Sequence, residues 1–108
     1  MSVDFDRMSA VEMRRRIIRR EISPVEITKR ALELAESTQK TLNAFSVLMP
    51  EAALASAKAA EDAVMKGQPL GLLHGIPFSV KDLIAVKDVI YASGSKTMAN
   101  NVATVDAP

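Results

Sequence analysis

The sequence lacks cysteine and tryptophan altogether, and aromatic residues make up only 4% of its 108 residues. Without cysteine the chain has no disulfide framework, no thiolate metal site and no cysteine nucleophile. The single histidine, His74, has no carboxylate cluster beside it, so we expect no metal site and interpret it as a loop residue. No apolar run approaches the ~20 residues of a membrane-spanning helix, so no membrane association is predicted.

The chain also lacks an excess of charge of either sign. Its formal net charge is +1 at pH 7, which gives no general attraction to nucleic acid or to an anionic membrane. Five arginines nevertheless gather between residues 14 and 20. Two roles are open for them: contact with nucleic acid or lipid, or a solvated helix face paired with Glu12 and Glu21. The scarcity of aromatic residues favours the solvated face, and we predict no nucleic-acid partner.

The composition that is present is ordinary for a globular protein. Hydrophobic residues make up 48% and charged residues 25% of the chain, which is too aliphatic for a disordered segment. A chain of this length can form one domain with a core, although it buries a smaller share of its surface than a larger one. Residues 1–7 are acidic and lack the apolar region of a secretory signal peptide, so we predict a cytoplasmic location.

Two capping boxes predict the starts of helices. The segment Ser9–Glu12 predicts a helix over residues 10–20, and Ser23–Glu26, with Pro24 at the first helical position, predicts a second over 24–38. The first helix should turn an apolar stripe toward a core. That stripe comprises Val11, Ile18 and Ile22, with Ile17 beside it.

The sequence predicts two strands, with a third helix between them. Alternating apolar residues predict a strand over 44–49, and an alanine-rich stretch from Pro50 predicts a helix over 50–66 with its stop signal at Gly67. A short apolar run predicts a last strand over 76–81. The predicted fold class is therefore α/β, in the order α-α-β-α followed by a strand and irregular structure.

The last predicted strand ends in a lysine. The run Ile76–Val80 is apolar except for Ser79, which is typical of a strand covered on both faces, and Lys81 follows it directly. Burial without a paired carboxylate disfavours the charged ammonium and can make a lysine a general base. Two interpretations stay open: a catalytic Lys81, or a lysine that pairs with Asp82 or reaches water at the strand end.

Short motifs follow one another along the chain in a distinctive order. They are Ser23–Glu26, Leu42–Phe45, the alanine-rich stretch before Gly67, Gly71, Gly75–Pro77, Lys81–Asp82, Gly94–Ser95 and Asp106–Pro108. In this order they resemble the amino-terminal segment of the amidase signature family, and the resemblance covers nearly the whole chain. Leu83 stands where members commonly carry asparagine, so the resemblance does not carry over a substrate preference.

The resemblance implies a hydrolase of carbon–nitrogen bonds with a Ser-cisSer-Lys triad, built on a mixed sheet covered by helices. Lys81 matches the lysine of that triad, which is its catalytic base. Both serines lie, in the family, downstream of the Asp106–Pro108 segment. Residues 1–108 are therefore interpreted as the amino-terminal fragment of a single amidase domain that is inactive alone. The resemblance implies a small carboxamide substrate for the complete enzyme and no cofactor.

Two alternatives to a free-standing amidase stay open. The same resemblance fits the amino-terminal part of the glutaminase subunit of a tRNA-dependent amidotransferase, in which ammonia from glutamine passes to a partner subunit. The chain could instead be a non-catalytic helical interaction module, if the gene ends after Pro108. Gly94-Ser95 stands where such glutaminase subunits tend to have Ala-Ser, which favours the free-standing amidase.

Overall fold

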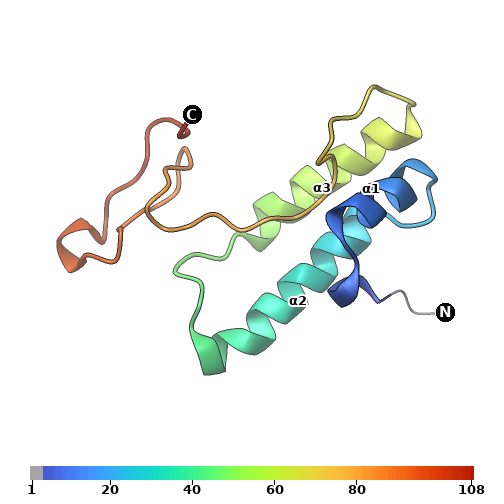
Figure 1. Ribbon diagram of the computed structural model, residues 1–108. Helices are drawn as coiled ribbons and strands as arrows, with labels where there is room; N and C mark the ends of the chain where they lie inside the picture. Colours follow the sequence, from blue (N-terminus) through green and yellow to red (C-terminus); the bar gives the residue numbers. More distant parts are fainter. Residues whose placement is uncertain (1–3) are drawn as a thin grey trace. The chain divides into compact units, whose positions relative to one another are not determined.

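A computed structural model describes residues 4–108 of the chain (Figure 1). Contacts divide the chain into two compact units, Met1–Pro77 and Phe78–Pro108. Within the described residues, the first unit contains a 3-10 helix and three α-helices, and the second contains one 3-10 helix and is otherwise irregular. These elements are η1 (Phe5–Arg7), α1 (Ala10–Ile18), α2 (Pro24–Leu42), α3 (Pro50–Met65) and η2 (Lys96–Met98).

Serine hydroxyls cap the first two α-helices where the sequence predicts their starts. The Ser9 hydroxyl accepts a hydrogen bond from the Glu12 amide at 3.2 Å, and α1 begins at the residue after the serine. The Ser23 hydroxyl accepts one from the Val25 amide at 3.0 Å, one residue earlier than a capping box requires, and Pro24 takes the first helical position. Both hydroxyls satisfy amides that have no partner within the helix.

A residue with left-handed backbone follows each α-helix. These residues are Arg20 at φ 60°, Asn43 at φ 47° and Gly67 at φ 67°. Helices α1 and α3 end close to the predicted residues 20 and 66, whereas α2 continues beyond the predicted end at 38, to Leu42. Thr38 lies within the helix, and its hydroxyl donates to the carbonyl four residues earlier at 2.8 Å. The helix ends instead at Asn43, which has left-handed backbone and whose amide donates to the Gln39 carbonyl.

The core of the first unit contains a cluster to which all three α-helices contribute. Ile17 of α1, Ile27 of α2 and Val64 of α3 are 1%, 2% and 8% exposed, and they form one cluster with Ile22. Helices α2 and α3 lie side by side and pack against each other (Figure 1). This cluster holds the helices that carry the amino-terminal motifs.

The apolar stripe predicted for the first helix is only partly correct. Ile22 is buried as expected, but Val11 and Ile18 are 71% and 44% exposed. Ile17, placed beside the stripe, is the residue that enters the core. Neighbouring helical residues point about 100° apart, so a helix that buries Ile17 must turn Ile18 toward its flank.

The strands predicted over 44–49 and 76–81 are absent from the described part of the chain, which corrects the expected α-β alternation. An isolated antiparallel bridge between Ile90 and Val102 is the β pairing found in residues 4–108. A strand needs a neighbouring strand to satisfy its amides and carbonyls, and the apolar pattern alone cannot supply one. The described chain is mostly helical, so the mixed sheet is not confirmed.

In residues 44–49, a side chain takes the hydrogen bonds that a neighbouring strand would make. The side-chain amide of Gln39 donates to the Phe45 carbonyl at 2.6 Å and accepts from the Phe45 amide at 3.1 Å. A strand would use the same two backbone groups for its ladder. The segment after α2 is thus a loop fastened to the helix that precedes it.

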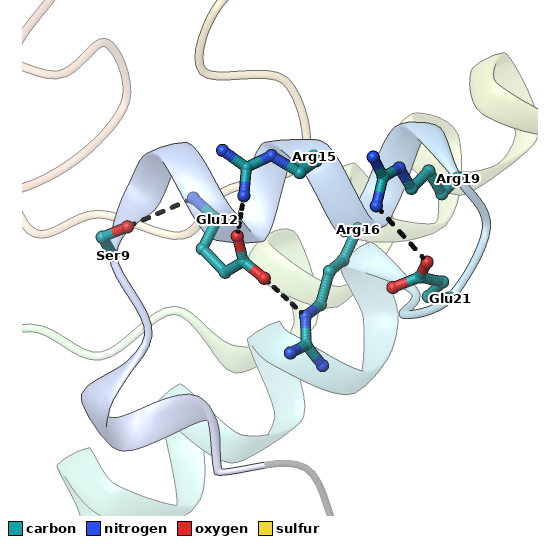
Figure 2. A network of polar contacts seen from close by, with 6 residues as sticks. All are labelled: Ser9, Glu12, Arg15, Arg16, Arg19 and Glu21. Atoms are coloured by element: carbon teal, nitrogen blue, oxygen red, sulfur yellow. Dashed lines mark hydrogen bonds and ion pairs between the residues drawn. The ribbon is translucent and has the colours of Figure 1, made fainter.

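Arginines of α1 and of the residue after it lie on a solvent-exposed face and pair with glutamates (Figure 2). Glu12 accepts from Arg15 at 2.6 Å and from Arg16 at 2.9 Å, and Arg19 lies 4.0 Å from Glu21. The hydrogen bond from Arg16 is the main cause that lowers the pKa of Glu12 below its ordinary value. The predicted pairing with Glu12 and Glu21 is confirmed for these three arginines, whereas Arg14 and Arg20 donate to the carbonyls of Gly71 and Val64 at 3.2 and 3.4 Å.

Candidate functional site

Lys81, the candidate catalytic residue, lies near the beginning of the second unit and is exposed to solvent. The apolar residues before it are exposed as well, Phe78 by 85% and Val80 by 42%. Burial of a strand on both faces needs a packed layer on each side, and these exposed side chains have none. The expectation that Lys81 lies in a buried strand is therefore wrong for the described residues.

The alternative pairing of Lys81 with Asp82 is not observed in residues 4–108. The Asp82 carboxylate instead accepts two backbone hydrogen bonds, from the Ala92 amide at 3.2 Å and from the Gly94 amide at 3.1 Å. Asp82 therefore joins the Lys81–Asp82 motif to the Gly94–Ser95 motif. The sequence offered no sign of this link beyond an aspartate ahead of a glycine-containing turn.

A second aspartate fastens the other end of the same unit. The Asp106 carboxylate accepts from the Lys87 amide at 2.7 Å, and the Ala107 amide donates to the Ala85 carbonyl at 2.9 Å. The three motifs of this unit, which contain Lys81, Gly94 and Asp106, are thus connected through hydrogen bonds to the backbone. Carboxylates that accept backbone N–H groups form strong, charge-assisted bonds, so two aspartates order a unit that has little regular secondary structure.

The serine of the Gly94–Ser95 motif is not set up as a nucleophile. Ser95 shares a hydrogen bond of 2.8 Å with the hydroxyl of Thr97. A serine becomes a strong nucleophile when an adjacent base takes its proton, and a threonine hydroxyl is no such base. Within the described chain, Lys81 is the candidate base, and Ser95 is not activated to act with it.

The glycine-rich motif of the first unit packs on the start of α2. Gly75 has φ +77°, and a Cβ atom at this position would lie 2.8 Å from Pro24 Cγ and 3.4 Å from Ile17 Cδ1. Next to it, Nε2 of His74 lies 2.9 Å from the Ala60 carbonyl, a distance that fits an N–H donated to this oxygen. The segment around Gly75 therefore packs against the segment around Pro24. His74 has the structural role expected of a loop residue.

No group of three or more histidine, cysteine, aspartate or glutamate side chains in residues 4–108 is arranged to hold a metal ion. In the same part of the chain, no helix combines the length and the apolar character required to cross a membrane.

Comparison with known proteins identifies the family. The family profile named Amidase matches residues 26–108, a range that contains Lys81 and all the motifs of the second unit. The chain therefore belongs to the amidase family, and the predicted membership of the amidase signature group is confirmed.

Individual relatives extend the comparison to nearly the whole chain. A glutamyl-tRNA(Gln) amidotransferase subunit of Clostridium botulinum (strain Eklund 17B / Type B) is 35% identical over 105 residues, which are 97% of this chain and 22% of that protein. The corresponding subunit of Chlamydia trachomatis serovar L2 (strain ATCC VR-902B / DSM 19102 / 434/Bu) is 40% identical over 101 residues, or 94% of this chain and 21% of the relative.

A solved structure has the same fold over the matched part. It is described as an unexpected vestigial protein complex that reveals the evolutionary origins of an s-triazine catabolic enzyme. It is similar to this chain with a TM-score of 0.86 and 30% identity, over 93% of this chain and 22% of the other. The chain thus spans about a fifth of the length of the relatives that it matches.

Proposed function

We propose that residues 1–108 are the amino-terminal part of a single amidase domain that hydrolyses the carbon–nitrogen bond of a small carboxamide. The observation that carries this proposal is the family match over residues 26–108. This range includes Lys81, which the order of the sequence motifs indicates as the lysine of the triad. A cytoplasmic location, without a nucleic-acid or membrane partner, stays a prediction.

In the complete enzyme Lys81 is the base of a Ser-cisSer-Lys triad. Its neutral amine takes a proton from a bridging serine, and that serine takes one from the nucleophilic serine as the latter attacks the amide carbon. The proton returns by the same route to the leaving nitrogen, ammonia departs, and water then hydrolyses the acyl-enzyme. A lysine accepts a proton only in its neutral form, so the remainder of the domain must cover the exposed Lys81.

The relatives favour a second candidate, the glutaminase subunit of a tRNA-dependent amidotransferase. Two glutamyl-tRNA(Gln) amidotransferase subunits are 35% and 40% identical to this chain over most of its length. In this version the carboxamide is glutamine, and the ammonia passes to a partner subunit. The chemistry at Lys81 is the same, and only the substrate and the recipient of the ammonia differ.

Ammonia release by the product of the complete gene distinguishes these functions. The gene is sequenced beyond the codon of Pro108, its product is purified, and ammonia release is measured with glutamine and with simple carboxamides. A free-standing amidase releases ammonia from the simple amides, whereas a glutaminase subunit prefers glutamine and depends on a partner. A stop codon directly after Pro108 favours the third possibility, a non-catalytic helical interaction module.

We predict that the 108-residue chain alone releases no ammonia above a buffer blank. Loss of the nucleophile and of the oxyanion donors removes most of the rate of a serine hydrolase, and Ser95 is bonded to Thr97 and not to a base. The assay uses glutamine and simple carboxamides, with Lys81→Ala as the comparison. Turnover that this substitution abolishes would contradict the proposal, because it requires a nucleophile within the 108 residues.

A further inference from the structure

Both oxygens of Asp82 are used to hold a loop further along the chain. Oδ1 accepts from the Ala92 amide at 3.2 Å, and Oδ2 accepts from the Gly94 amide at 3.1 Å. The donors lie ten and twelve residues beyond the aspartate. We call this arrangement the Asp82 clamp.

The clamped loop needs an external support for its shape. Ser93 and Gly94 have φ values of 50° and 71°, so two successive residues are left-handed. A serine rarely adopts this conformation, because its Cβ approaches the backbone too closely. A carboxylate that accepts two N–H groups makes charge-assisted bonds, which are stronger than neutral ones and offset this strain.

The clamp also fixes the backbone of Lys81. Consecutive Cα atoms are only about 3.8 Å apart, so any restraint on Asp82 is a restraint on the residue before it. The Lys81 carbonyl in addition accepts a hydrogen bond from the Ile84 amide at 2.9 Å, which closes a turn around the aspartate. The backbone from which the lysine side chain starts is thereby joined to the Ala92–Gly94 loop.

We propose that Asp82 is a positioning residue, which directs the amine of Lys81 by clamping its backbone to the Ala92–Gly94 loop. This inference rests on the proposed role of Lys81 as a base. Proton transfer requires the amine within hydrogen-bond reach of the bridging serine. A displacement of about 1 Å in such a site can cost ~10²-fold in rate, so a clamp at the base of the side chain affects catalysis without touching the substrate.

The first experiment tests the clamp in the 108-residue chain, independently of catalysis. In Asp82→Asn one carboxylate oxygen becomes an NH₂ group, which cannot accept the second amide. We expect hydrogen exchange of the Ala92 and Gly94 amides to accelerate about tenfold or more. The matched control is Asp88→Asn, because Asp88 is exposed and asparagine tolerates its φ of 66°. Equal exchange in the two variants would overturn the clamp.

The second experiment tests positioning in a complete amidase domain. Residues 1–108 replace the aligned segment of the Chlamydia trachomatis relative, and the chimera is assembled with the partner subunits of that amidotransferase. Ammonia release from glutamine is then measured for Asp82→Asn, Lys81→Ala and the double variant. We expect Asp82→Asn to lower kcat about tenfold or more with little change in KM. The double variant should be no slower than Lys81→Ala, because the aspartate acts through the lysine.

The outcomes separate the two hypotheses. An inactive parent chimera, or full activity of Lys81→Ala, argues against the proposed function. In that case the hydrogen-exchange experiment alone tests whether the Asp82 clamp holds the loop. A dead Lys81→Ala beside a fully active Asp82→Asn leaves the proposed function standing and overturns the positioning role. Losses that multiply in the double variant also overturn it, because they show an effect of Asp82 that does not pass through Lys81.

Discussion

At the scale of single residues, Gly75 shows how a motif residue acts through packing. The sequence indicates a turn glycine, and its φ of +77° agrees with that interpretation. The sequence does not reveal that a proline ring occupies the space where a Cβ atom would lie, 2.8 Å from Pro24 Cγ. This contact joins residues far apart in the chain, so no local pattern predicts it.

We predict that Gly75→Ala destabilises the first unit by about 2 kcal/mol or more, through the left-handed φ and the overlap with Pro24. The measurement is urea unfolding followed by far-ultraviolet circular dichroism, which reports the three α-helices. Gly71→Ala is the control, because no atom outside its two chain neighbours lies within 4 Å of its Cβ position. Equal midpoints for the two variants would show that the close approach at Gly75 does not matter for stability.

At the scale of elements, an ion pair fastens η1 to α2. Arg30 donates from Nε and Nη2 to the two oxygens of Asp6, at 3.1 and 2.9 Å. The hydrogen bond from Arg30 is the main cause that lowers the pKa of Asp6 below its ordinary value of 3.8. Both side chains are partly exposed, so we expect a small contribution to stability.

The lowered pKa fixes how this contribution depends on pH. A carboxyl with a depressed pKa in the folded state stabilises the fold fully above its unfolded value and loses that stabilisation as the pH falls through the folded value. We therefore expect Asp6→Asn to be less stable than the parent at about pH 7, with a smaller deficit at about pH 3. Unfolding at both pH values checks this, with Asp4→Asn as a control of the same type. A deficit for Asp6→Asn that persists undiminished in acid would point to a role other than the ion pair.

The helices were predictable because their signals are local. Serine caps, an N-terminal proline and a terminal glycine each act within one turn of the chain, and α1 and α3 begin at the predicted residues, Ala10 and Pro50. The loop after α2 was not predictable in the same way. Its alternating pattern suits a strand, but Gln39 takes the hydrogen bonds that a neighbouring strand would otherwise make.

At the scale of the whole molecule, the motifs identified the family, whereas the environment of Lys81 could not be derived from them. Burial of a strand depends on layers packed over it, and the chain spans only about a fifth of the length of its relatives. In the described residues the lysine is exposed, and the aspartate beside it is committed to a loop. The identity of the candidate base is a sequence inference, and the structure adds the backbone that holds it.

Substitution of Lys81 in a complete domain decides whether this lysine acts as a general base. In the chimera with the Chlamydia trachomatis relative, we expect Lys81→Ala to lower kcat for glutamine hydrolysis by about 10²-fold or more, because a general base is lost. Lys81→Arg should be no better, since a guanidinium group does not release its proton at working pH. Lys87→Ala, which removes another exposed lysine of the same unit, should keep the parent rate. Near-parent hydrolysis by Lys81→Arg would show that residue 81 acts as a positive charge and not as a base.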